Sequence, residues 1–395
     1  MDENKLPVAL HLFPVFRLGG AERVVLDLVR LLPERGFRCR LCVFGEDGRF
    51  PDRDLIPQDL VELGQRGSIT RSFSTIRSVR RMRRMLANED VDLLHTHLWP
   101  ADLVGALANI RTGLPHVSHQ HGTGKELLRG GVRPTLKRDI SRRLMRLSGA
   151  RFVAVSEAVR THVSRVYGVH RNRISLIPNG FCEGQFPGRR RTIASGGDRL
   201  TVGYAGRFDE EKGIPHLIRA FARMKERERR ARLRLAGAGP LESKCRQLCS
   251  HVGISDAVEF CGPVSDMASF YAGLDVFVLP SLSEGLPMSL IEALAMGCVP
   301  VVSDVGGVRE VLQDGVEGRI VSPGDENELA RALITLAEQP ELHARMARAG
   351  RKRARTQFTA DRMANSIAAL YRTILAEREG CGAHTRRDEG GIAGA

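Results

Sequence analysis

Short apolar runs alternate with helix-like stretches along most of this chain. In the first half, the runs that we predict to be strands are residues 7–13, 38–44, 91–97, 115–120, 151–156 and 174–178. In the second half they are residues 200–206, 231–237, 257–262, 274–280, 299–304 and 318–323. Amphipathic helical patterns fit between nearly all of them. Repeated strand–helix alternation predicts an α/β protein whose parallel sheets are covered by helices on both faces.

The alternation breaks at residues 178–199, which are rich in Gly, Pro and Arg and have no period. This break and the length of 395 residues predict two α/β domains, 1–180 and 181–356. Residues 379–395 have the composition of a disordered tail. Because ligands of doubly wound sheets bind beyond the carboxyl ends of the strands, we expect the site in the cleft between the domains.

The composition is that of a globular protein, with 42% hydrophobic and 27% charged residues. No apolar run approaches the ~20 residues that span a bilayer. The N-terminal residues 1–10 do not resemble a signal peptide, and eight cysteines are too few for a disulfide scaffold, so we expect a cytoplasmic protein. Cys39 and Cys42 form a CxxC pattern, but their odd spacing in a strand predicts opposite faces and no shared metal.

The net charge of +14 indicates an anionic partner. Nucleic acid is not expected, because aromatic residues make up only 5% and no basic stretch is rich in them. Two arginine-rich segments, 72–86 and 133–149, read as amphipathic helices. Their apolar positions are Phe73, Ile76, Val79 and Met82 in the first and Leu136, Ile140, Leu144 and Leu147 in the second. Two interpretations stay open. Either each helix packs its apolar positions on a sheet, or the two helices together contact the anionic inner face of a membrane.

Histidines follow two neighbouring strands, at His95 and His97 and at His119 and His121. Four histidines suggest zinc, but no Cys, Asp or Glu completes a ligand set at a typical spacing. We therefore expect no metal, and a neutral histidine that hydrogen-bonds a sugar hydroxyl or a phosphate. His95 also fits a satisfied core residue.

Two further turns carry phosphate-binding features. Gly19 and Gly20 follow the first strand and open a helix, whose N-terminus favours an anion. Arg207 and Lys212 flank a later strand-to-helix turn, where two cations fit a diphosphate without a metal. The Asp-x-Asp of residues 90–92 precedes its strand and so lies at the wrong end of the sheet for a metal site.

Residues 280–297 place Glu284 in a loop and Glu292 on a helix that we expect to start near Pro287. Two carboxylates could perform acid–base chemistry, bind a metal or accept hydrogen bonds from hydroxyls. The free N–H groups of the helix start, around Leu286 to Ser289, can hold phosphate oxygens. A nucleotide-sugar, with its sugar, diphosphate and ribose, has the matching layout.

The segments LGGAERV, HQHGT, AVSEAVR, IPNG, GYAGRFDEEKG, AGAGP, SEGLPMSLIEALAMG and VVSDVGGVREV together resemble the family-4 retaining glycosyltransferases of the GT-B fold. The resemblance covers residues from about 7 to 375. It implies two Rossmann-like domains that face each other across a cleft, with helix 357–378 packing back on the first. It also implies retaining transfer from a UDP- or GDP-sugar, without a cofactor, to a glycan or lipid-linked acceptor in surface polysaccharide or glycolipid synthesis.

The resemblance also implies roles for individual residues. Arg207 and Lys212 would hold the diphosphate, Glu292 the ribose and Glu284 the transferred sugar. The remaining donor contacts would come from Gly20, Gly285, Leu286, Pro287, Met288 and His121, with His121 at the sugar 6-position and His119 as its rival. Two alternatives stay open: another GT-B enzyme, such as an epimerase or a phosphorylase, and a catalytically silent nucleotide-sugar binding protein.

Overall fold

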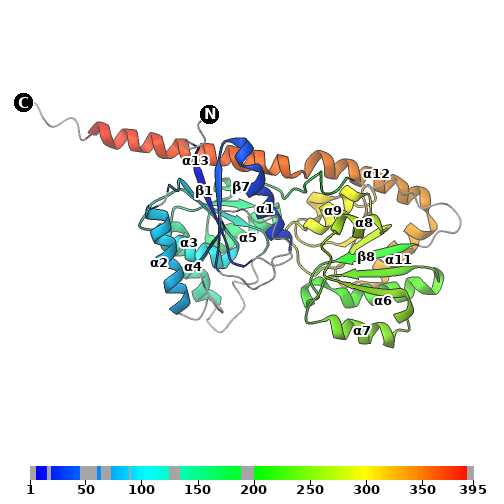
Figure 1. The fold of residues 1–395 in the computed structure, drawn as a ribbon. Coiled ribbons are helices and arrows are strands. Elements are labelled where there is room, and N and C mark those ends of the chain that lie inside the picture. Colours follow the sequence, from blue (N-terminus) through cyan, green and yellow to red (C-terminus); the bar gives the residue numbers. More distant parts are fainter. Residues whose placement is uncertain are drawn as a thin grey trace, which may run out of the picture.

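The computed structural model describes residues 6–15, 19–44, 60–63, 73–88, 90–123, 134–187 and 200–388. Figure 1 shows two α/β units side by side, each built around its own sheet. All twelve strands expected from the sequence are present, and every strand pairing is parallel. The prediction of two parallel-sheet domains is confirmed. A further strand, β3 (Val61–Glu62), is only two residues long, too short to produce a recognisable period.

The first sheet has the order β3-β2-β1-β4-β5-β6-β7 within the described residues. Its other strands are β1 (Val8–Phe13), β2 (Arg38–Val43), β4 (Leu93–His97), β5 (His116–Gln120), β6 (Arg151–Ala154) and β7 (Ile174–Leu176). Its helices are α1 (Gly20–Leu31), α2 (Phe73–Asn88), α3 (Leu98–Asn109), α4 (Pro134–Leu147) and α5 (Glu157–Tyr167). Alternate residues of β1 and β2 enter separate apolar clusters, one with α1 and one with α2 and α3. Helices therefore cover both faces of the sheet.

The second sheet has the order β10-β9-β8-β11-β12-β13. Its strands are β8 (Thr201–Ala205), β9 (Arg232–Ala236), β10 (Val258–Gly262), β11 (Val276–Leu279), β12 (Val299–Ser303) and β13 (Arg319–Val321). Its helices are α6 (Ile214–Arg227), α7 (Glu242–His251), α8 (Met267–Ala272), α9 (Met288–Met296), α10 (Val308–Val311) and α11 (Glu326–Glu338). In both sheets the strand order reverses beside the first strand, which is where doubly wound folds bind ligands.

The chain passes between the domains at two adjacent points. Residues 178–187 of the expected linker are described, and residues 188–199 lie outside the described residues. Phe181 forms an isolated parallel bridge with Thr359, between α12 (Pro340–Gln357) and α13 (Ala360–Asp388). Figure 1 shows α13 running back along the first domain, where it packs against α1.

The prediction of a disordered tail is wrong for residues 379–388, because α13 continues to Asp388. This segment contains no proline, and each residue added to an existing helix gains a hydrogen bond, so its two glycines do not end the helix. Residues 389–395 lie outside the described residues.

The two arginine-rich helices pack differently from the expectation that each buries its apolar stripe. In α4 the stripe residues Leu136, Ile140 and Leu147 are 51%, 46% and 57% exposed. The helix contacts the domain instead through buried Lys137 and Met145, among others. In α2, Met82 is buried but Ile76 is exposed, and the side chain of Phe73 lies outside the described residues. The packing interpretation is therefore wrong for α4 and half right for α2.

Two smaller predictions concern motifs without a ligand. Cys42 lies in the core beneath α2 and α3, whereas Cys39 packs against the α1 side, so the two thiols point to opposite faces as expected. Asp92 accepts a hydrogen bond from the Val8 backbone N–H at 2.8 Å, which fixes it at the amino end of the sheet.

Over the described part of the chain, no helix is both long and apolar enough to cross a membrane.

Candidate functional site

The loop between β11 and α9 carries the first of the two glutamates. Glu284 accepts a hydrogen bond from Lys212 Nζ at 2.7 Å, and its side chain is only 9% exposed. Lys212 ends a short 3-10 helix (Glu210–Lys212), followed by Gly213 in the left-handed conformation with φ +62°. A Cβ at residue 213 would collide with the carbonyl oxygen of Pro280. The glycine thus brings the lysine loop against the glutamate loop.

Helix α9 begins next to Pro287. Pro287 is its N-cap, with extended dihedral angles of φ −73° and ψ 118°, and Met288 is the first helical residue. The prediction that the helix starts near Pro287 is therefore confirmed, with Pro287 at the N-cap because its ψ is extended rather than helical. Pro287 has no backbone N–H, but it lies outside the helix, so each helical residue of α9 keeps its own N–H. Met288 is buried and packs next to Gly20 of the first domain, where a Cβ would lie 3.1 Å from its Cγ.

Glu292 is paired across the two domains. Arg23 of α1 donates to Glu292 Oε1 at 2.5 Å, and the Tyr271 hydroxyl donates to Oε2 at 3.1 Å. Glu292 is 4% exposed, and burial raises the pKa of its carboxyl group while Arg23 lowers it. Burial also opposes the charged form of Arg23, yet the contact with Glu292 holds the arginine pKa above its ordinary value. Burial is the larger of these effects, so the Glu292 pKa stands above its ordinary value even though the carboxyl group is held beside a cation from the opposite domain.

Arg207, the other predicted phosphate-binding cation, follows β8. Its guanidinium pairs with Asp209 at 3.1 Å, and its side chain is 70% exposed. Its carbonyl oxygen accepts a hydrogen bond from the Tyr204 hydroxyl at 2.8 Å, which fixes the backbone of the turn. The guanidinium is therefore accessible to a ligand, whereas the Lys212 ammonium is engaged with Glu284.

Backbone contacts close the glutamate loop against the first domain. The Ser156 hydroxyl donates to the Gly285 carbonyl oxygen at 3.1 Å, and Asn179 donates to that of Leu286 at 3.1 Å. A Cβ on Gly285 would collide with the His121 carbonyl oxygen, so only glycine permits this approach. Leu286 is buried in the same contact.

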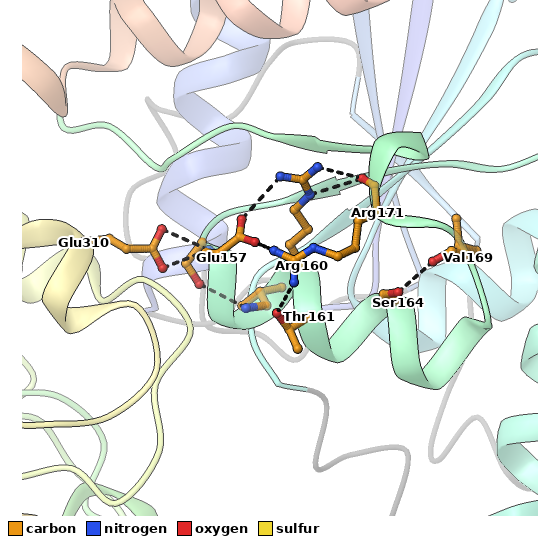
Figure 2. A network of polar contacts seen from close by, with 9 residues as sticks. Glu157, Arg160, Thr161, Ser164, Val169, Arg171 and Glu310 are labelled. Atoms are coloured by element: carbon orange, nitrogen blue, oxygen red, sulfur yellow. Dashed lines mark hydrogen bonds and ion pairs between the residues drawn. The ribbon is translucent and has the colours of Figure 1, made fainter.

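A second contact between the domains lies at the start of α5. The Glu310 carboxylate accepts the Glu157 backbone N–H at 2.8 and 2.9 Å, and so fills the N-terminus of a helix in the other domain. Figure 2 shows that the Glu157 side chain turns the other way, toward Arg160 and Arg171. Both guanidinium groups are held in turn, Arg160 by the Arg171 carbonyl oxygen and Arg171 by Thr161. The Glu310 contact thus joins the two domains, and the arginine network holds Glu157 in place within the first domain.

The first domain contributes a stack of buried histidines. His11, His95, His97, His119 and His121 lie with neighbouring ring centroids 4.2–5.4 Å apart. Burial lowers the pKa of His11 and His121 to about 3, and it lowers the pKa of the other three well below the ordinary value, helped by neighbouring imidazoles. The rings are neutral at ordinary pH. His121 is half-buried while His119 is fully buried, so His121 is the more accessible of the two rivals.

The same stack brings together nitrogens that could hold a metal. Those of His11, His95 and His97, and those of His97, His119 and His121, lie within 4.8 Å of one another. The first group includes His11, which the sequence did not single out, whereas the second consists of three histidines that it did. Neutral imidazoles are the form that binds transition metals.

Comparison with known proteins places this arrangement in a family. Residues 18–182 match the family described as Glycosyltransferase Family 4, and residues 188–353 match Glycosyl transferases group 1. A D-inositol 3-phosphate glycosyltransferase of Streptomyces griseus is 30% identical over 320 residues, which cover 72% of this chain and 68% of that protein. The chain belongs to the group 1, family-4 glycosyltransferases of the GT-B fold.

Solved structures share the fold of this glycosyltransferase. A sucrose-phosphate synthase from Thermosynechococcus elongatus superposes with a TM-score of 0.79 at 22% identity, covering 94% of this chain and 100% of that one. Anabaena HepE, solved in complex with UDP and glucose, gives a TM-score of 0.77 at 21% identity, covering 93% and 100%.

The candidate site contains residues that the sequence alone did not indicate. Arg23 and Tyr271 surround Glu292, and His11 joins the histidine stack. Arg23 could have been suspected, since it lies one turn after Gly20 on the helix that opens toward the cleft. Tyr271 lies in a short helix without any sequence signal of its own.

Proposed function

We propose that this glycosyltransferase moves a sugar from a UDP- or GDP-sugar to a glycan or lipid-linked acceptor, with retention of the anomeric configuration. The proposal rests chiefly on one observation: each glutamate beside the start of α9 is held by a cation, Glu284 by Lys212 and Glu292 by Arg23. Carboxylates held in this way are acceptors for the hydroxyls of a sugar and a ribose. The nearby helix start and Arg207 suit the diphosphate between them.

The chemistry follows from what these side chains can offer. Glu284 is hydrogen-bonded to a lysine, which makes it an orienting acceptor rather than a free nucleophile. We therefore assign no covalent intermediate. The acceptor oxygen bonds to the anomeric carbon as the bond to the diphosphate breaks, and the acceptor's proton passes to an oxygen of the leaving diphosphate. Arg207 and Lys212 supply the positive charge that stabilises this leaving group without a metal.

Support for a nucleotide donor comes from the HepE structure, whose fold this chain shares and which was solved with UDP and glucose. A nucleoside diphosphate fits the chemistry of the cations and of the helix start described above. The identity of the base and of the sugar follows from neither observation, so the donor class is proposed as UDP- or GDP-linked.

The acceptor side is proposed from the surface of α4. Three exposed apolar side chains, Leu136, Ile140 and Leu147, share this helix with exposed Arg143 and Arg146. Apolar side chains between arginines are the pattern of a helix that lies in an anionic membrane surface. We propose that the first domain docks there from the cytoplasmic side and takes a lipid-linked acceptor in surface polysaccharide or glycolipid synthesis. The relative from Streptomyces griseus is named for a soluble acceptor, which makes inositol 3-phosphate the natural alternative.

A donor panel tests the proposal. Purified protein is incubated with UDP- and GDP-sugars, with lipid-linked glycans or inositol 3-phosphate as acceptors, and products are followed by mass spectrometry and anomeric NMR. We expect one donor to give a glycosylated product with the donor's anomeric configuration. Isomerisation of the donor sugar would indicate an epimerase, and binding without turnover a silent binding protein.

A further inference from the structure

Three of the buried histidines lie where two neighbouring strands of the first sheet end. His97 is the last residue of β4, His119 lies one residue before the end of β5, and His121 follows β5 directly. One ring nitrogen of each lies within 4.8 Å of those of the other two. His97 Nδ1 and His121 Nε2 are 3.1 Å apart. Two nitrogens on a tetrahedral zinc ion are separated by roughly 3.3 Å, so this spacing is close to that of a ligand pair.

His119 lacks the partners that a buried imidazole normally has. It is fully buried, and neither of its ring nitrogens has a hydrogen-bond partner among the described residues. The N–H and the lone pair of a buried imidazole are usually both satisfied. His121 Nδ1 is also buried without a partner in the described structure. A metal ion would engage a nitrogen that the protein itself leaves unused.

His97 is already held in the way that a metal-ligating histidine requires. Each of the three rings is neutral at ordinary pH and so offers a lone pair. His97 Nε2 lies 3.2 Å from His11 Nδ1, so an N–H at Nε2 can donate to His11 while Nδ1 keeps its lone pair. Histidines that bind metals almost always donate their other N–H to a neighbouring acceptor.

One ring has to turn for an ion to bind. His119 and His121 are stacked, with centroids 4.3 Å apart and planes 18° apart, whereas a metal lies in the plane of each ring that binds it. Turning His119 out of the stack breaks no hydrogen bond, because its nitrogens make none to the described residues. His121 is half-buried while the other two are fully buried, so the ion reaches the group on the His121 side.

We propose that His97, His119 and His121 bind zinc or a similar transition-metal ion, with a water molecule as the fourth ligand. Neutral imidazole nitrogens suit zinc, cobalt and nickel, whereas magnesium and calcium prefer oxygen ligands. The sequence alone predicted no metal because it sought a thiolate or carboxylate, but three histidines and a water also complete a zinc site. The ion joins the ends of β4 and β5 to the backbone at His121, which packs against Gly285 of the second domain.

The experiment uses the tag-free full chain, treated with the chelator dipicolinate and then dialysed. We expect one equivalent of zinc to bind in calorimetric titration, and cobalt to give the visible absorption of a four-coordinate site with nitrogen ligands. Magnesium should not bind at this site. Zinc at about a hundredfold excess over its Kd should raise Tm by about 5–10 °C, because the ion binds the folded domain and not the unfolded chain.

Three single substitutions locate the ion. His119→Gln removes one ligand, and should weaken zinc binding by about a hundredfold or more and abolish the cobalt absorption. His11→Gln removes the acceptor behind His97, and should weaken binding about 10- to 100-fold while the cobalt absorption persists. His116→Gln is the matched control: His116 is also buried on β5 but belongs to neither histidine group, so zinc affinity should not change. Circular dichroism of each metal-free variant checks its fold.

Three results would overturn the proposal. The first is the absence of zinc binding by the wild-type chain, a measurement that decides the question even if a substitution prevents folding. The second is unchanged zinc affinity in His119→Gln, which would place the ion elsewhere. The third is a sulfur-to-cobalt charge-transfer absorption, which would show that cysteines hold the metal.

Discussion

The two domains meet the same ligand cleft with opposite kinds of polar group. At the carboxyl ends of its strands, the second domain offers ions: Arg207, Lys212, Glu284 and Glu292. The corresponding edge of the first domain offers neutral imidazoles, stacked and linked to one another. Charges suit a diphosphate, and neutral rings suit hydroxyls. Under the proposed function, two similar folds would divide the recognition of a nucleotide-sugar between charged groups on one side and neutral rings on the other.

The outer surfaces differ as well. Within the described residues, large exposed hydrophobic side chains are more frequent on the first domain, with Ile76, Ile110, Leu136, Ile140, Leu147 and Leu176, than on the second, with Leu282 and Val316. Three of the six lie on α4 among arginines. The first domain therefore has both the interior suited to a hydroxyl and the exterior suited to a membrane.

The largest expected effect is on the stability of the first domain in acid. A histidine in an unfolded chain titrates near pH 6.5, whereas burial lowers the pKa of His11, His116 and His121 to about 3. Between pH 6.5 and about 3, these histidines are protonated in the unfolded chain but not in the folded domain. The free energy of unfolding therefore falls as pH drops below about 6.5, by up to about 1.4 kcal/mol per pH unit for each histidine.

Two buried carboxyl groups act in the opposite direction. Burial raises the pKa of Asp27 to about 7 and that of Asp102 to about 6, so their protonation stabilises the fold in acid. They are outnumbered by the six buried histidines of this domain, the three above together with His95, His97 and His119. The single tryptophan, Trp99, reports on the first domain. Its fluorescence should change at a higher pH than the last part of the loss of far-UV circular dichroism of the whole protein, and a single coincident transition would contradict the comparison.

A smaller effect is expected at the ion pair between the domains. Arg23→Met leaves the buried Glu292 carboxyl group with Tyr271 as its remaining hydrogen-bond partner among the described residues, and should lower the free energy of unfolding by about 1.5–3 kcal/mol. It should also weaken nucleoside diphosphate binding. Arg30→Met, on the same helix but hydrogen-bonded to Cys182 Sγ rather than to Glu292, is the control. Thermal unfolding and calorimetric titration measure both effects, and equal behaviour of the two variants would show that the pair has no role.

Binding to membrane vesicles tests the difference between the outer surfaces of the two domains. Two double substitutions test it: Leu136→Ser with Ile140→Ser, and separately Arg143→Glu with Arg146→Glu. Each should reduce binding to anionic vesicles at least tenfold, since each basic residue near such a surface contributes about 1 kcal/mol. Neutral vesicles should bind poorly, and salt should release the protein. Arg142 is left unchanged because it donates to the carbonyl oxygens of Arg165 and Val166.

The matched control for this charge reversal is Arg345→Glu with Arg348→Glu. These residues have the same spacing and exposure on α12 of the second domain. The control pair should retain vesicle binding. Equal binding of wild type to neutral and anionic vesicles would contradict docking on an anionic membrane and favour a soluble acceptor.

The smallest effect is expected from chelation. Arg207, Lys212 and the start of α9 already supply positive charge for a diphosphate, so EDTA should leave the transfer rate unchanged. Activity lost in EDTA and restored by magnesium or manganese would contradict a metal-free donor side.

The sequence predicted the two sheets because strands contain continuous apolar runs, such as residues 276–280, between turns that contain glycine. It also placed Glu284 and Glu292 on a loop and a helix, because the local pattern around Pro287 is strong. It could not predict that Arg23 reaches Glu292, since the two are 269 residues apart and the contact depends on how the domains close. Nor could periodicity predict which face of α4 is buried, because Trp99 holds Lys137 and Ser141 against the domain and turns the leucines outward.

The central claim is that the second domain separates recognition of the sugar from recognition of the diphosphate, and two substitutions test it directly. Calorimetric titration of the free nucleoside diphosphate is compared with transfer rates for Glu284→Ala and Lys212→Ala. We predict that Glu284→Ala keeps the diphosphate affinity, because it frees the Lys212 ammonium, while transfer falls about 10- to 100-fold. Lys212→Ala should weaken both. Much weaker diphosphate binding by Glu284→Ala, or full transfer by Lys212→Ala, would contradict the account.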